Sequence, residues 1–154
     1  MLVKILALVL IALCLANCAR TKETLTVRQF QLRDQVANKG DDPMVRIEKM
    51  RRLHGAVSME ERRQRLGQYY TLNWQDHEGV GNGPVEVLFE YRQGGTASEI
   101  KRLSEVYPAT EADGMVEFAV VGDNYFDHGK VLAWRASVSR GGQHLASKKS
   151  FLWD

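Results

Sequence analysis

Hydrophobic and polar residues alternate in several stretches of the chain beyond residue 69. In one of them Val85, Val87, Phe89 and Tyr91 take every second position, with Glu86, Glu90 and Arg92 between them. This period of two is typical of a half-buried β-strand. Similar stretches cover residues 70–74, 116–120, 132–138 and 144–153, and a less regular one covers residues 100–107. Glycine-containing turns at residues 93–96, 122–124 and 140–143 separate them, so the pattern predicts an antiparallel sandwich of short strands.

The apolar residues near position 30 change their parity once. Leu25 and Val27 are followed by Phe30 and Leu32, which predicts a strand that bulges or bends. Residues 38–43 are turn formers and end this strand.

A helical period replaces the alternation between residues 44 and 66. Val45, Ile47, Met50 and Leu53 mark the apolar side of a first helix, which Gly55 interrupts. The sequence of residues 58–61, Ser-Met-Glu-Glu, fits a capping box and predicts a second helix that ends before residue 67.

Together these patterns predict a mainly β protein, an antiparallel immunoglobulin-like sandwich preceded by a short helical segment. Residues 25–68 are expected to hold one strand and two short helices, and residues 69–154 the β-sandwich domain. The strand rhythm of residues 69–153 is similar to that of immunoglobulin-like and fibronectin type III domains. Trp74 on an early strand and the late hairpin support this resemblance.

The amino terminus has the pattern of an export signal. Lys4 precedes twelve apolar residues, 5–16, a run shorter than the roughly 20 residues that a membrane-spanning helix needs. The sequence of residues 15–18, Leu-Ala-Asn-Cys, resembles the lipobox of bacterial lipoproteins, although Asn17 stands where Gly, Ala or Ser is usual. Ordinary signal removal, which leaves a soluble periplasmic protein, and an uncleaved amino-terminal anchor helix are the alternatives.

The resemblance to lipoproteins implies cleavage before Cys18 and acyl chains such as palmitate on its thiol. Residues 1–17 would then be the signal peptide, residues 18–24 a polar tether, and Cys18 the only thiol of the mature chain. A lone cysteine in an exported protein has no disulfide partner in its own chain, which favours lipidation. Ala19, which is not Asp, implies sorting to the outer membrane with the protein facing the periplasm. The mature chain also resembles small bacterial lipoproteins, a resemblance that implies no activity.

Composition and charge narrow the possible functions. The chain has 154 residues, is 44% hydrophobic and 26% charged, and carries a formal charge of +2. These values are ordinary for one globular domain, and they exclude the strongly basic class of nucleic-acid-binding proteins. We therefore expect no nucleic-acid partner.

Few residue patterns point to catalysis, to a metal or to a cofactor. Two Asp-His pairs, residues 76–77 and 127–128, would offer zinc two imidazoles and two carboxylates if their loops lay at the same end of the sandwich. Solvated turns explain them more simply. No Gly-x-Ser-x-Gly elbow is present, and the glycine-rich residues 79–83 lead into a strand instead of a helix. We therefore expect neither an enzyme nor a bound metal or cofactor.

Two groups of residues are candidates for contacts with other molecules. Arg51, Arg52, Arg62 and Arg63 belong to a basic stretch that would contact anionic headgroups or an acidic partner, or would form a solvated helical face. Tyr125 and Phe126 lie in an expected loop and would contact a glycan or a small ligand. The leading hypothesis is a non-enzymatic, lipid-anchored envelope protein that binds another protein, and the alternative is a periplasmic glycan- or small-ligand-binding module.

Overall fold

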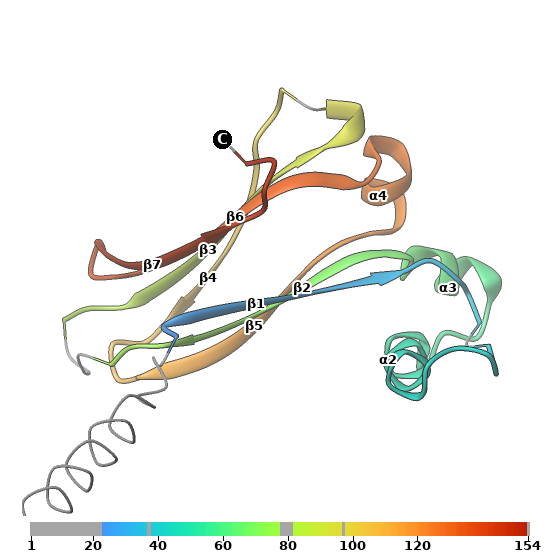
Figure 1. Cartoon of the computed structure of the whole chain (residues 1–154), viewed down its shortest axis with the longest axis horizontal. Helices are drawn as coiled ribbons and strands as arrows, with labels where there is room; N and C mark the ends of the chain where they lie inside the picture. The colour runs from blue at the N-terminus through green and yellow to red at the C-terminus, as the bar shows by residue number, and fades with distance from the viewer. Residues whose placement is uncertain (1–22, 37, 78–81, 97, 154) are drawn as a thin grey trace, which may run out of the picture.

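Two antiparallel sheets face each other in the computed structural model, which describes residues 23–36, 38–77, 82–96 and 98–153 (Figure 1). The first sheet has the strand order β1-β2-β5, and the second has the order β4-β3-β6-β7. The strands are β1 (Leu25–Leu32), β2 (Gly67–Gln75), β3 (Val85–Gln93), β4 (Lys101–Tyr107), β5 (Asp113–Val121), β6 (Val131–Arg140) and β7 (Gln143–Lys149). The predicted fold class, a mainly β antiparallel sandwich with a short helical segment, is confirmed.

The helical segment lies between the first two strands. It comprises α2 (Pro43–Leu53) and α3 (Met59–Gln64), and β1 pairs with β2 along its whole length. The first strand is therefore part of the sandwich, whereas the sequence pattern placed it in a separate segment with the helices. The alternation that identified β2 does not reveal which strand lies beside it, because pairing joins residues distant in sequence.

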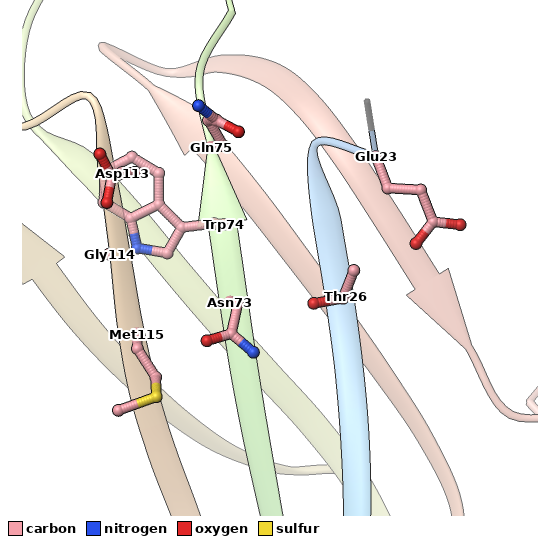
Figure 2. Close-up of a pocket in the computed structure, with 8 residues that line it drawn as sticks. All are labelled: Glu23, Thr26, Asn73, Trp74, Gln75, Asp113, Gly114 and Met115. Atoms are coloured by element: carbon pink, nitrogen blue, oxygen red, sulfur yellow. The ribbon is translucent and has the colours of Figure 1, made fainter. Parts of the chain in front are cut away.

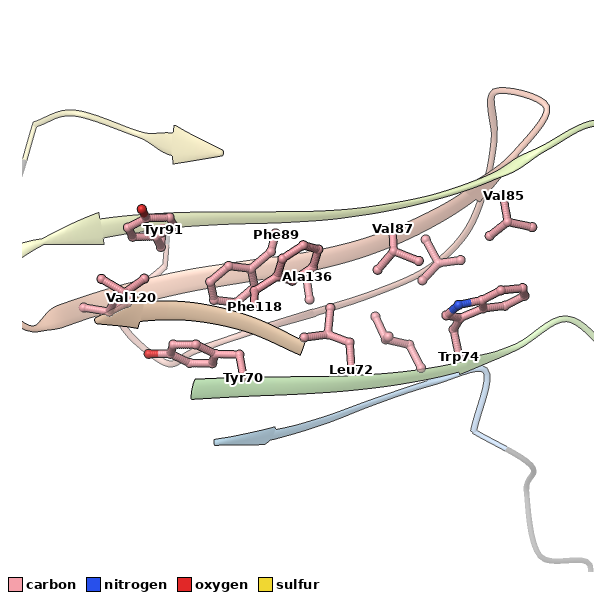
Figure 3. Packing of buried hydrophobic residues seen from close by; sticks show 13 residues of the cluster. Tyr70, Leu72, Trp74, Val85, Val87, Phe89, Tyr91, Phe118, Val120 and Ala136 are labelled. Atoms are coloured by element: carbon pink, nitrogen blue, oxygen red, sulfur yellow. The ribbon is translucent and has the colours of Figure 1, made fainter. Parts of the chain in front are cut away.

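The core fills the space between the sheets. Side chains of β2, β3 and β5 point toward one another there, with the rings of Tyr70, Phe89 and Phe118 packed together (Figure 3). The ring centroids are 4.6 Å apart for Tyr70 and Phe89 and 5.8 Å apart for Phe89 and Phe118. The alternating apolar residues of β2 and β3 are thus buried by the sandwich, whereas in β6 Leu132 is exposed and its neighbours Val131 and Ala133 are buried instead.

The parity change in β1 has a different cause from the one expected. Strand β1 pairs with β2 without any register shift, so it contains no bulge. Leu25 and Val27 contact the core between the sheets, whereas Phe30 and Leu32 belong to a second cluster, with Tyr69, Leu66 and Leu53. The apolar residues of β1 therefore change from the inner face of the sheet to its outer face, which the helices cover at the carboxyl-terminal end of the strand.

The last strand ends earlier than the predicted residue 153. Strand β7 stops at Lys149, and the amide of Ser150 then donates to the carbonyl of Trp134 (2.8 Å). A turn follows, and it buries Trp153 against the guanidinium groups of Arg92 and Arg135, which lie 5.0 and 5.3 Å from the ring centroid. These cation–π contacts hold the segment against the outer face of the second sheet.

Candidate functional site

Helix α2 presents its apolar side to the outside. Met44, Ile47 and Met50 are 73%, 55% and 52% exposed, while Lys49 and Arg52 are only 6% and 8% exposed. The apolar side of a surface helix ordinarily faces the core. We call the exposed side chains of Met44, Ile47 and Met50, together with the exposed Val36 nearby, the α2 surface.

The outer face of the first sheet explains why α2 buries an arginine. Glu117 of β5 accepts two hydrogen bonds from the guanidinium of Arg52, at 2.9 and 2.7 Å. The same guanidinium lies 3.6 Å from the centre of the Tyr69 ring. A planar, bidentate ion pair and a cation–π contact compensate the desolvation of Arg52. The sheet therefore binds the basic side of α2 and Leu53, and leaves Met44, Ile47 and Met50 uncovered.

Lys49, the other buried basic residue of α2, also pairs with carboxylates. Its ammonium group bonds the carboxylates of Asp34 (2.8 Å) and Asp41 (2.9 Å), which lie in the segment before α2. These hydrogen bonds raise the pKa of Lys49, and the bond from Lys49 lowers the pKa of Asp41. Two carboxylates on one ammonium fix the start of α2 against the end of β1.

The carboxylate that binds Arg52 has a lowered pKa. Burial by itself would raise the pKa of Glu117, but the hydrogen bonds and the charge of Arg52 outweigh it and hold this pKa below its ordinary value. Glu117 is thus ionised at neutral pH and completes the pair.

The four arginines predicted to contact an anionic surface do not form one free basic patch. Arg52 is buried against Glu117. Arg51 is exposed but bonds the carboxylate of Glu48 at 2.9 and 2.8 Å. Arg63 bonds Asp123 of helix α4 (Gly122–His128) at 3.0 Å. Arg62 has no carboxylate partner among the described residues, and its Nε donates to a backbone carbonyl at 3.2 Å. Sequence alone does not reveal this neutralisation, because Glu117 and Asp123 lie more than fifty residues further along the chain.

A hollow of about 210 Å³ adjoins the α2 surface. It is lined by Gln35, Val36, Met50, Leu53, His54 and Arg62. The apolar residues come from the segment after β1 and from α2, and Arg62 comes from α3. This end of the sandwich therefore offers an apolar depression with basic side chains beside it.

Tyr125 and Phe126 lie on a helix instead of the predicted loop. Helix α4 (Gly122–His128) follows β5 directly, and with Gly122 at its start it has too few apolar residues for a helical period to be recognised. Phe126 is exposed, and Tyr125 accepts a hydrogen bond from Gln31 of β1 (3.0 Å). Both aromatic side chains line a hollow of about 250 Å³ with Gln31, Leu32, Arg33, Leu66 and Lys130.

A further hollow lies at the opposite end of the first sheet. It measures about 420 Å³ (Figure 2). It is lined by Glu23, which precedes β1, by Thr26 of β1, by Asn73, Trp74 and Gln75 of β2, and by Asp113, Gly114 and Met115 of β5. Sequence reasoning missed it, because its polar side chains are the ordinary outward positions of three strands.

The two Asp-His pairs lie at opposite ends of the sandwich. Asp76 follows β2 and pairs with the buried Arg140, whereas Asp127 and His128 belong to α4, which follows β5. Because β2 and β5 are antiparallel, these positions are separated by the length of the strands. Across the described ranges no three His, Cys, Asp or Glu residues are grouped as metal ligands. The geometry thus contradicts a zinc site shared by the two pairs.

No family model, curated protein or solved structure matches the chain. The candidate sites accordingly rest on the geometry of this protein alone. None of the helices in the described part of the chain has the length and apolar character that a membrane crossing requires. Cys18 and the predicted signal peptide, residues 1–17, lie outside the described residues.

Proposed function

We propose that this protein is a non-enzymatic, lipid-anchored protein of the bacterial cell envelope that binds another protein through the helical end of its sandwich. The lipobox-like residues before Cys18 support the anchor, and Ala19 supports the outer membrane, facing the periplasm. The observation that carries the interaction is the exposed α2 surface. Contiguous exposed apolar side chains on a folded domain mark contact sites for other molecules.

The direction of β1 supports an interaction away from the anchoring bilayer. The strand begins at Leu25, directly after the proposed tether of residues 18–24, and runs to the end that carries α2, α3 and α4 (Figure 1). Eight residues of strand span roughly 25 Å. An anchor at Cys18 would place the helical end on the side that faces the periplasm, where protein partners are available.

Photo-crosslinking in cells of the host tests the interaction. Ile47→p-benzoylphenylalanine places the probe on the α2 surface, and Met115→p-benzoylphenylalanine is the matched control, exposed on β5 at the other end of the sandwich. We expect discrete polypeptide adducts from position 47 and few from position 115. Equal yields at both positions would contradict the proposed interaction surface.

A second substitution tests the anchor. Cys18→Ser removes the thiol that would carry the lipid, so we expect the protein to leave the membrane fraction. Mass analysis of the amino-terminal peptide should find acyl chains on Cys18 in the unaltered protein. A variant that still sediments with membranes would favour the uncleaved anchor helix.

Small-ligand binding at α4 is the second candidate function. The hollow of about 250 Å³ joins Tyr125 and Phe126 to the cationic Arg33 and Lys130, a set suited to a planar or sugar-like ligand that carries a negative charge. A glycan array that includes acidic sugars tests it. Binding that Phe126→Ala abolishes and Met115→Ala leaves unchanged would favour this function over the first.

A further inference from the structure

Basic side chains without carboxylate partners border the α2 surface. Arg62 and His54 line the hollow of about 210 Å³ beside Met50, and Arg46 lies on α2 one turn before Met50. In the part of the chain that the structure describes, neither Arg46 nor Arg62 pairs with a carboxylate; each donates to a backbone carbonyl. Residues 33–65 contain nine Lys and Arg against six Asp and Glu, a net charge of +3.

The acidic groups of this region have partners within it: Asp42 and Glu61 cap the starts of α2 and α3, and Glu60 lies 3.7 Å from Arg63. Asp34 and Asp41 bind Lys49, and Glu48 binds Arg51 and Arg52. The uncompensated charge at the outer border of the α2 surface is therefore positive. An occupant that buries this surface and compensates its charge needs apolar side chains and carboxylates together.

We propose, building on the proposed function, that the α2 surface binds an acidic segment of another polypeptide in which a large apolar residue lies close to a carboxylate. The apolar side chain fills the hollow between Val36, Met50 and Leu53, and the carboxylate pairs with Arg62. Met44 and Ile47 extend the apolar contact along about two turns of α2. Methionines suit such a surface, because their unbranched side chains adapt to a partner's shape.

Charge and position distinguish an acidic polypeptide from two other possible occupants of the α2 surface, a second copy of this chain and a lipid bilayer. A second copy in a symmetric contact would place the same positive border against itself, which opposes self-association through α2. The bilayer that holds an anchor at Cys18 lies at the opposite end of β1. An acidic polypeptide satisfies both the charge and the location.

Crosslinking from inside the hollow, combined with charge reversal, tests the partner's chemistry. Met50→p-benzoylphenylalanine is introduced into host cells in four backgrounds: unaltered, Arg62→Glu, Arg46→Glu and Lys148→Glu. Lys148 is the control, since it lies on β7 and pairs with Glu23, far from α2. Thermal unfolding of each purified variant identifies any that fail to fold. If either Arg62→Glu or Arg46→Glu fails to fold, the other still tests the charge of the partner.

The expected adducts are peptides with net negative charge and at least one large apolar residue at the crosslink. Arg62→Glu and Arg46→Glu should each lower the adduct yield by about fivefold or more, the effect of losing one well-placed charge pair and gaining a repulsion. Lys148→Glu should leave the yield unchanged.

Four results would overturn the inference. Polypeptide adducts that are neutral or basic, or yields that both reversals leave unchanged, would refute the acidic partner and leave the proposed function standing. Lipid adducts in place of peptides would assign the α2 surface to a membrane. Yields at position 50 no higher than at position 115 would overturn the proposed function as well.

Discussion

At the residue scale, the buried Arg140 donates four side-chain hydrogen bonds. Its guanidinium pairs with Asp76 and donates to the carbonyls of Gly83, Ala109 and Glu111, at 3.2, 3.1 and 2.7 Å. Asp76 and Gly83 belong to the connection between β2 and β3, and Ala109 and Glu111 belong to the connection between β4 and β5. One side chain thus holds together the loops at this end of the sandwich.

Arg140→Met should destabilise the protein strongly. The substitution leaves the carboxylate of Asp76 and three carbonyls without this donor, and breaking a buried ion pair costs about 3–5 kcal/mol. Urea unfolding followed by tryptophan fluorescence measures the loss. Lys148→Met, which removes the more exposed pair with Glu23, should cost less than about 1 kcal/mol. Similar losses for the two variants would contradict the role of Arg140.

The ion pair between Arg52 and Glu117 predicts a pH dependence. Because the folded protein lowers the pKa of Glu117, the pair stabilises the fold above the ordinary pKa of 4.5, and this stabilisation disappears as the pH falls through the lowered value. Glu117→Gln should therefore be less stable than the unaltered protein at about pH 6, with a difference that shrinks toward about pH 3. Urea unfolding at a series of pH values measures it.

The exposed Glu86 of β3 provides the control for this measurement. Glu86→Gln should change the free energy of unfolding little at any pH, because no side chain in the described part of the chain bonds Glu86. A constant difference between Glu117→Gln and the unaltered protein across the pH series would mean that the charge of Glu117 does not stabilise α2.

At the element scale, local sequence signals predicted much of the fold. Alternating residues located most of the strands, and the capping box was correct: Ser58 accepts from the amide of Glu61 (3.1 Å), and the carboxylate of Glu61 accepts from the amide of Ser58 (2.9 Å). These signals depend on contacts within a few residues. The orientation of α2 does not, because it depends on Arg52 meeting a carboxylate 65 residues away.

The difference between local signals and contacts between distant residues also explains how much of the candidate sites the sequence predicted. Tyr125 and Phe126 were proposed as contact residues because they are aromatic and lie in an expected loop. Their helix was missed, and so were Gln31 and Lys130 beside them. The α2 surface was visible only as an apolar stripe, which usually indicates a buried face. Which side of an amphipathic helix is buried is decided by the surface opposite, and a single sequence does not specify that surface.

Gly67, the first residue of β2, lies where β2 and β5 approach each other closely. Its φ is +146°, and a Cβ at this position would lie 2.2 Å from the carbonyl oxygen of Val120 and 2.8 Å from the Cα of Val121. Gly67→Ala should therefore separate β2 from β5 at this end and cost roughly 2–4 kcal/mol. Gly40→Ala, where nothing lies within 4 Å of the new Cβ, should be neutral or slightly stabilising in thermal unfolding. Equal losses would contradict the close approach.

At the scale of the whole molecule, the sandwich separates two kinds of surface. The end where β1 begins has the polar hollow with Glu23 and Asp113, and the end where β1 finishes has α2, α3 and α4 (Figures 1 and 2). Under the proposed function, the first end lies near the bilayer and the second faces the periplasm. Because β1 runs from the proposed tether to the helical end, the position of the anchor would determine the direction in which the α2 surface faces.

This orientation is measurable by energy transfer to the bilayer. The lipidated Cys18 would have no free thiol, so a single introduced cysteine can carry a donor dye on the protein reconstituted into vesicles with acceptor-labelled lipid. A dye at Met115→Cys reports the position of the end near Glu23. A dye at Ile47→Cys reports the position of the α2 surface, at the other end of β1, a strand that is roughly 25 Å long. Transfer should be stronger from position 115, and Cys18→Ser should abolish it at both. Stronger transfer from position 47 would turn the helical end toward the headgroups and favour the anionic-surface contact first considered for Arg51, Arg52, Arg62 and Arg63.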